Sequence, residues 1–317
     1  MKDIAIIMPT YKAHKTIKRT LASMVNQMGP SYRIYISVDG EQEGSYDYLL
    51  TMFDMLDIKI LYSPINRGCG GARQYGIDNS VEPFFTFIDT DDIFNSINSL
   101  SILHRSFEDQ DVLVCTPFWR QMLDGTFALK NVSILTWMHG KMYRRSFIDK
   151  HGIRFNTEYT NSNEDVGFNL QIGLISDSIT ERIKQLNDQA VYIQLDNSDS
   201  LTRKNNGEFL YKSNVTGYIM NKIHAYKYVI ETVKMIDKDI RESIIKALAN
   251  IFDNYFGRFL DNEEFIKTFH DFSKIFYKEV YHYTDEIDEA RREVIEREIL
   301  YTDKSYGDFI KWKETLK

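Results

Sequence analysis

The stretch Ile4-Ala5-Ile6-Ile7-Met8-Pro9 is a short apolar run that ends at a proline. A run of this length without polar alternation is typical of a strand buried on both faces of a parallel sheet. Apolar residues then recur at helical spacing at Ile17, Leu21 and Met24, and Gly29-Pro30 follows where such a helix would close. The start of the chain therefore predicts a buried strand followed by a helix.

The same alternation continues through the first two-thirds of the chain. Further strands are predicted at residues 33–38, 58–62, 84–88 and 112–115, and helices at residues 46–53, 71–77 and 99–107. Strand–helix alternation favours an α/β fold, with a mostly parallel sheet and helices on both faces. Ligands of such sheets bind outside the carboxyl ends of the strands, so the residues that follow each strand are the first candidates for a site.

Composition and charge exclude several classes of protein. The 317 residues are 43% apolar, which is too apolar for a disordered chain, and the two cysteines, Cys69 and Cys115, cannot form a disulfide framework. No leader pattern and no apolar run near the ~20 residues of a membrane span is evident, so we expect a cytoplasmic protein without a membrane span. The net charge of −7 argues against a general nucleic-acid binder, and it means that an anionic ligand would need a cation as mediator.

The character of the sequence changes at about residue 208. Apolar and aromatic residues keep a helical period from there to about residue 276, without strand-like alternation. We therefore expect a sheet domain over residues 1–207 and a helical module over residues 208–317. The module can fill a core, shape an acceptor cleft or join a homo-oligomer, and core filling is the commonest fate of such aromatic stripes.

The sharpest local motif is Phe85-Thr86-Phe87-Ile88-Asp89-Thr90-Asp91-Asp92, an apolar strand that ends in three carboxylates. Alternate residues of an extended chain point the same way, so Asp89 and Asp91 can share one cation. Hard divalent cations take oxygen ligands and keep positions open for phosphate oxygens. A strand-end turn whose aspartates cap the next helix explains the triplet equally well.

Two other predicted strands also end in polar or aromatic residues. The first ends in Pro9-Thr10-Tyr11, where the tyrosine ring offers a face on which a nucleobase can stack. The second ends in Val38-Asp39-Gly40, where the carboxylate can accept a hydrogen bond from a ring N–H. Each of these is turn chemistry when taken singly, but their occurrence at neighbouring strand ends favours a binding site.

A glycine-rich stretch, Asn66-Arg67-Gly68-Cys69-Gly70-Gly71-Ala72-Arg73, leads into a predicted helix. Glycines allow a ligand to approach the backbone closely, and Arg73 can hold an anion. The stretch matches neither the dinucleotide fingerprint nor the phosphate-binding loop that ends in Gly-Lys-Ser/Thr. A flexible turn with a surface arginine is the plainer alternative.

Paired acids, Glu164 and Asp165, open another predicted helix. Acids at a helix start usually serve as caps, and a carboxylate there can also act as a general base when it faces a cleft. Upstream, Trp137 to Tyr143 supplies aromatic and polar groups that can line such a cleft. His139 within this segment is equally well explained as a hydrogen-bonded structural histidine.

Taken in order along the chain, these motifs resemble those of family 2 glycosyltransferases, which have the Rossmann-like GT-A fold. The resemblance covers roughly residues 1–205. It implies that Pro9, Tyr11 and Asp39 hold the nucleotide base of a nucleoside-diphosphate sugar. It also implies that Asn66, Gly68 and Arg73 lie near the nucleotide and its diphosphate.

The resemblance further assigns the chemistry of the site. Asp89-Thr90-Asp91 corresponds to the family's D-x-D element, with Asp91 as the direct ligand of Mn²⁺ or Mg²⁺ and Asp89 beside it. Asp165 of the Glu164-Asp165 pair corresponds to the base that removes the acceptor hydroxyl proton in inverting members. The implied activity is metal-dependent transfer of a sugar, most simply from a UDP-sugar, to an acceptor hydroxyl.

Some features depart from the family pattern or leave alternatives open. The segment from Tyr192 to Arg203 lacks the histidine that often serves there as a further metal ligand, and the Q-x-x-R-W element of processive synthases is missing, which favours transfer of a single sugar. Ser200 to Arg203 matches a loop that closes over the donor in relatives. The acceptor can be a glycan, a cell-wall polymer, a lipid-linked oligosaccharide, a protein or a modified DNA base. A non-catalytic nucleotide-sugar or glycan binding protein and a sugar nucleotidyltransferase are the competing functions.

Overall fold

The computed structural model describes residues 2–40, 44–131, 137–157, 164–178 and 182–196, together with short pieces at 203–204, 208–209, 224–225, 228–229 and 232. The chain divides into two units, Met1–Leu210 and Tyr211–Lys317. The helical module predicted over residues 208–317 and the donor-closing loop at residues 200–202 lie almost entirely outside the described residues.

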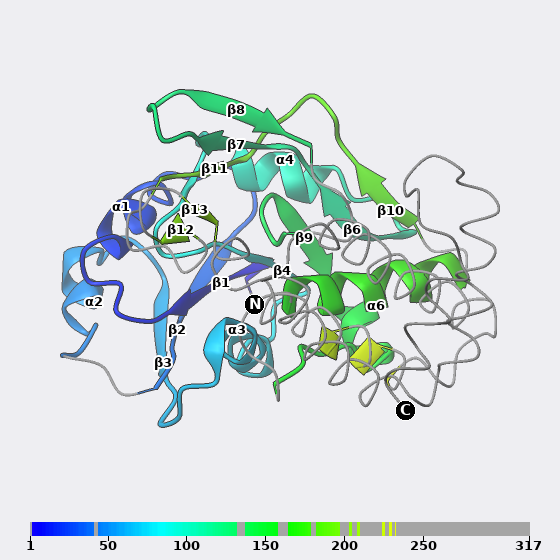
Figure 1. Ribbon diagram of the computed structural model, residues 1–317, viewed down its shortest axis with the longest axis horizontal. Helices are drawn as coiled ribbons and strands as arrows, with labels where there is room; N and C mark the ends of the chain where they lie inside the picture. The colour runs from blue at the N-terminus through cyan, green and yellow to red at the C-terminus, as the bar shows by residue number, and fades with distance from the viewer. Residues whose placement is uncertain are drawn as a thin grey trace, which may run out of the picture. The chain divides into compact units, whose positions relative to one another are not determined.

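A seven-stranded sheet forms the centre of this unit, in the order β10-β6-β9-β4-β1-β2-β3 (Figure 1). Its strands are β1 (Ile4–Thr10), β2 (Tyr32–Val38), β3 (Ile58–Tyr62), β4 (Phe84–Phe87), β6 (Asp111–Cys115), β9 (Lys141–Arg144) and β10 (Arg182–Gln185). β1 pairs in parallel with β2 and β4, and β2 pairs in parallel with β3. The predicted α/β fold with a mostly parallel sheet is confirmed.

The register of the parallel strands brings their carboxyl ends to one edge of the sheet. Thr10 at the end of β1 pairs with Val38 at the end of β2, and Ile7 pairs with Phe87 at the end of β4. The residues that follow these strands therefore emerge side by side, as expected for ligand sites on such sheets.

Helices cover both faces of the sheet. Successive side chains of β1 point to opposite faces, and all of them are buried, so both faces need a covering layer. The described helices are α1 (Ile17–Ala22), α2 (Tyr48–Met52), α3 (Gly68–Asp78), α4 (Ser99–Arg105), α5 (Arg145–Lys150) and α6 (Glu164–Ser178). Ile6 belongs to the same buried cluster as Leu21 of α1 and Leu100 of α4, whereas Ile7 contacts Gly76 of α3 on the other face. Phe168 of α6 packs edge-on against Phe87 of β4.

A smaller sheet lies beside the central one, in the order β5-β11-β7-β8. It consists of β5 (Ile93–Phe94), β7 (Phe118–Gln121), β8 (Phe127–Lys130) and β11 (Tyr192–Gln194). β11 runs antiparallel to β5, which directly follows the acidic motif, and parallel to β7. This pairing carries Tyr192 back to the end of β4. A two-stranded piece, β12 (Arg203–Lys204) with β13 (Glu208–Phe209), is also described.

Two features of the fold differ from the sequence expectation. β9 lies inside the sheet and runs antiparallel to both β4 and β6, whereas residues 137–143 were expected only to line a cleft. The helix expected over residues 71–77 begins at Gly68, so most of the glycine-rich stretch forms its first turns. Among the described residues, no helix combines the length and the apolar character that crossing a bilayer requires.

Candidate functional site

The ends of β1 and β2 place Tyr11 and Asp39 at the same edge. The Tyr11 side chain is 47% exposed, while Asp39 is buried and its Oδ1 accepts a hydrogen bond from the backbone N–H of Arg67 at 2.7 Å. Burial raises the pKa of Asp39, although the backbone hydrogen bonds oppose this shift. This hydrogen bond connects the end of β2 to the loop after β3.

A close backbone approach fixes this junction. Gly40 has φ +74°, and a Cβ atom built on it would lie 2.8 Å from Cβ of Asn66, so a side chain would collide there. Asn66 Oδ1 accepts the N–H of Gly68, which opens α3. The sequence-predicted residues Asp39, Asn66 and Gly68 thus lie together where the end of β2 meets the start of α3.

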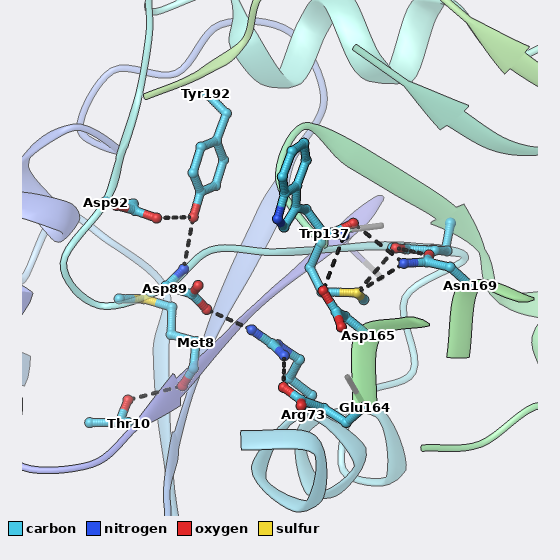
Figure 2. Close-up of polar contacts among 12 residues, drawn as sticks. Met8, Thr10, Arg73, Asp89, Asp92, Trp137, Glu164, Asp165, Asn169 and Tyr192 are labelled. Atoms are coloured by element: carbon cyan, nitrogen blue, oxygen red, sulfur yellow. Dashed lines mark hydrogen bonds and ion pairs between the residues drawn. The ribbon is translucent and has the colours of Figure 1, made fainter. Parts of the chain in front are cut away.

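Arg73 of α3 is only 4% exposed and binds two protein carboxylates (Figure 2). Its Nη2 lies 2.9 Å from Oδ1 of Asp89, and its Nη1 lies 3.0 Å from Oε1 of Glu164. The sequence predicted that Arg73 would hold an anionic ligand, but both Nη atoms are engaged by side chains of the chain itself. Its Nε atom has no hydrogen-bond partner among the described residues.

The acids on either side of Arg73 respond to it differently. Burial favours the neutral form of Asp89, but the Arg73 guanidinium holds the pKa of this carboxyl below its usual value. Burial and the neighbouring charge of Asp165 raise the pKa of Glu164 to about 7, against the opposing effect of Arg73. One guanidinium therefore connects an ionised acid at the end of β4 with an acid at the start of α6.

Asp165 is held by backbone donors at the start of α6 (Figure 2). Its Oδ2 accepts the N–H of Trp137 at 3.1 Å, and its Oδ1 accepts the N–H of Val166 at 2.8 Å. Asn169, one turn along α6, donates to the carbonyl of Trp137. The segment before β9 is thereby tied to the acidic helix start. Asn163, which precedes the pair, lies outside the described residues.

The acidic turn after β4 is bound to α1 through its backbone. The backbone carbonyls of Thr90 and Asp91 accept hydrogen bonds from Thr20 and Arg19 of α1. Asp92 is buried, and burial together with the neighbouring acids raises the pKa of its carboxyl well above the usual value.

Sequence reasoning did not predict the contact of Tyr192 with the acidic turn. It also did not predict that His139 lies close to the carboxylates of this turn. The Tyr192 hydroxyl donates to Oδ2 of Asp92 at 2.6 Å and accepts the N–H of Asp89 at 3.2 Å. Ligand atoms of Asp89, Asp92 and His139 lie within 4.8 Å of one another, and this group does not include Asp91. Burial lowers the pKa of His139 to about 4. No local pattern could have paired Tyr192 with a turn one hundred residues earlier.

Comparison with known proteins identifies a family for this chain. Residues 5–162 match the profile described as glycosyl transferase family 2. A processive diacylglycerol beta-glycosyltransferase of Mycoplasma pneumoniae is 25% identical over 148 residues, which cover 44% of this chain and 43% of that protein. The chain matches less than half the length of such curated relatives, with 37%, 43% and 33% covered in three of them.

Solved structures of low identity share the fold. TarS residues 1–349 of S. aureus, in complex with UDP-GlcNAc, superpose with a TM-score of 0.65 at 18% identity, over 93% of this chain and 91% of that one. A mannosyltransferase of Pyrobaculum calidifontis, in complex with GDP-Man and Mn²⁺, gives a TM-score of 0.53 at 11% identity, over 79% and 72%. On the match over residues 5–162, the chain belongs to glycosyl transferase family 2.

Proposed function

We propose that this protein transfers a single sugar from a nucleoside-diphosphate sugar, a UDP-sugar in the first place, to an acceptor hydroxyl with inversion at the anomeric carbon. Family membership supports the reaction class. The complex of TarS with UDP-GlcNAc supports the choice of donor, because TarS shares the fold of this chain.

The observation that carries the proposal is the bridge through Arg73. It links Asp89, at the strand edge where the donor is expected, to Glu164, the neighbour of the proposed base Asp165. An inverting transfer needs positive charge at the leaving diphosphate, which a cation held by carboxylates can supply, and a base at the acceptor side, at a fixed separation. A single buried guanidinium that contacts both acidic elements supports this division of roles.

On this proposal each group has a defined task. Tyr11 stacks on the nucleotide base, and Asp39 accepts a hydrogen bond from the base. Pro9, near the end of β1, belongs to the same base-binding group. Asn66 and Gly68 line the nucleotide. Asp165 removes the proton of the acceptor hydroxyl as the oxygen attacks, and a positioned base of this kind typically contributes ~10²–10⁴-fold to the rate.

A divalent cation fits the acidic turn. Carboxylate oxygens are the ligands that Mg²⁺ and Mn²⁺ take, and Asp89 with its 29% exposed side chain is open toward a ligand. We assign Asp89 and Asp91 to the cation, flanking Thr90, and the mannosyltransferase solved with GDP-Man and Mn²⁺ supports this choice. When bound, the ion would neutralise negative charge that develops on the departing diphosphate.

Transfer of a single sugar stays a prediction. The M. pneumoniae relative is named as processive, and the match covers 43% of its length. Acceptor choice within a shared fold resides in loops and attached modules, so the acceptor class and any oligomer formed through residues 208–317 stay open.

A donor panel tests the proposal. The full chain is incubated with UDP- and GDP-sugars and Mn²⁺, and thermal shift, slow donor hydrolysis and the released nucleotide are measured. We expect one UDP-sugar to raise the melting temperature and to release UDP. Release of pyrophosphate in a parallel assay with UTP and a sugar 1-phosphate would instead indicate nucleotidyl transfer, and donor binding without any turnover would indicate a non-catalytic binding protein.

A further inference from the structure

We infer that His139 is a ligand of the divalent cation and that it forms, with Asp89 and Asp92, a three-residue metal site at the end of β4. This inference rests on the proposed function, because it names chain residues that hold the metal. It adds His139 and Asp92 as further ligands to the proposed pair Asp89 and Asp91, and Asp89 belongs to both sets.

The first support is convergence. One ligand atom from each of the three side chains lies within 4.8 Å of the other two. Opposite ligands of a Mg²⁺-sized ion are separated by roughly 4 Å, since each bond is about 2.1 Å long. Inward movement of the side chains would therefore bring the three ligand atoms around one cation.

The second support is the state of the imidazole. His139 is 6% exposed, and its contacts with described residues are ring contacts, with Phe118 at 4.9 Å and Tyr192 at 4.7 Å between centroids. Within the described part of the chain, no hydrogen bond engages its ring nitrogens. A neutral buried imidazole without such a partner, next to two carboxylates, has one ring-nitrogen lone pair available for a cation.

The third support is that one side chain positions all three ligands. The Tyr192 ring stacks on His139 at an interplanar angle of 28°, and its hydroxyl bonds both the carboxylate of Asp92 and the backbone N–H of Asp89. The N–H of Leu195 binds the other oxygen of Asp92. Outer hydrogen bonds that orient the ligands are a regular part of metal sites. If the acidic turn served only to cap a helix, a buried histidine close to its carboxylates would not be required.

A spectroscopic test uses the full chain with Mn²⁺ and UDP. Pulsed electron paramagnetic resonance on protein labelled with ¹⁵N-histidine is expected to show a directly coordinated histidine nitrogen. His139→Gln should remove this coupling and weaken Mn²⁺ binding by about tenfold or more, measured by calorimetry. His104→Gln, on α4 outside the group, is the matched control and should change neither.

The outcomes separate this inference from the proposed function. Mn²⁺ bound with UDP but without histidine coupling in the parent protein would overturn the role of His139 and leave metal-dependent transfer standing. Persistence of the coupling in His139→Gln would overturn it as well. Absence of any Mn²⁺ binding would overturn both. The measurement on the parent decides the matter even if the variant does not fold.

Discussion

Arg73 is the residue at which the two sides of the proposed site meet. Its guanidinium is almost fully buried and makes its described polar contacts with Asp89 and Glu164. Removing one partner of a buried ion pair leaves an uncompensated charge, which costs far more than the pair itself contributes. We therefore regard Arg73 as a group that keeps two acidic elements together, and its predicted place near the diphosphate of the donor stays a prediction.

Replacing Arg73 by methionine tests this view. Arg73→Met should lower the free energy of unfolding by about 3 kcal/mol, because two acids lose their common cation. Urea denaturation measures the loss. Arg154→Met removes an exposed pair with Asp78 and should change stability by less than about 1 kcal/mol. A similar small effect at both positions would contradict the structural role of Arg73.

Glu164 gives a pH dependence of defined sign. Its pKa is raised from 4.5 to about 7, so the native state binds more protons than the unfolded state between these values. Stability due to this group is therefore present below pH 4.5 and is lost as the pH rises to 7. Glu164→Gln should gain stability relative to the parent between pH 5 and pH 7 in urea titrations.

A surface glutamate is the control for this prediction. Arg182 and Lys184 lower the pKa of Glu108 to about 2, so its charge does not change between pH 5 and pH 7. The stability difference between Glu108→Gln and the parent should stay constant over that range. A constant difference for Glu164→Gln as well would show that Glu164 is not titrating there.

At the scale of elements, α3 is the helix that builds the site. Its glycines let it approach both β1 and the start of α6, because a Cβ on Gly76 would lie 2.4 Å from Ile7 and one on Gly70 would lie 2.9 Å from Glu164. The helix thus contacts the core with one side and carries Arg73 to the acids with the other.

Two alanine substitutions in the same helix separate these roles, since both gain the same helix propensity. Gly76→Ala should cost about 1–3 kcal/mol by overpacking against Ile7, with little change in turnover per folded molecule. Gly70→Ala should displace the flexible Glu164 side chain, with a smaller stability loss and turnover lowered about tenfold or more. The pair is compared by denaturation and by donor turnover, and equal loss of turnover in both would contradict the assignment.

The sequence predicts elements formed by local pattern and fails where contacts are distant. Apolar runs located β1 and the acidic end of β4, and the parallel-sheet rule placed their ends together. β9 was missed because its four residues, Lys-Met-Tyr-Arg, carry a charge at each end. The link from Tyr192 to Asp92 spans one hundred residues, so neither it nor the approach of His139 leaves a local signal.

At the scale of the whole molecule, an acidic chain of net charge −7 is proposed to bind a diphosphate. Arg73 is paired with two acids of the chain, and we therefore propose that a bound cation neutralises the leaving group. On this proposal the base on α6 and the acidic turn after β4 act on opposite sides of the reacting sugar. This division of labour is the central claim.

The most direct test compares turnover and donor binding in Asp165→Asn. Asparagine keeps the shape and the acceptor oxygen but cannot take up the proton, so turnover should fall by about 10²–10⁴-fold while the UDP-sugar affinity stays within about twofold of the parent. Asp91→Ala should lower both the turnover and the UDP-sugar affinity. Undiminished, metal-dependent sugar transfer by Asp165→Asn would contradict the account.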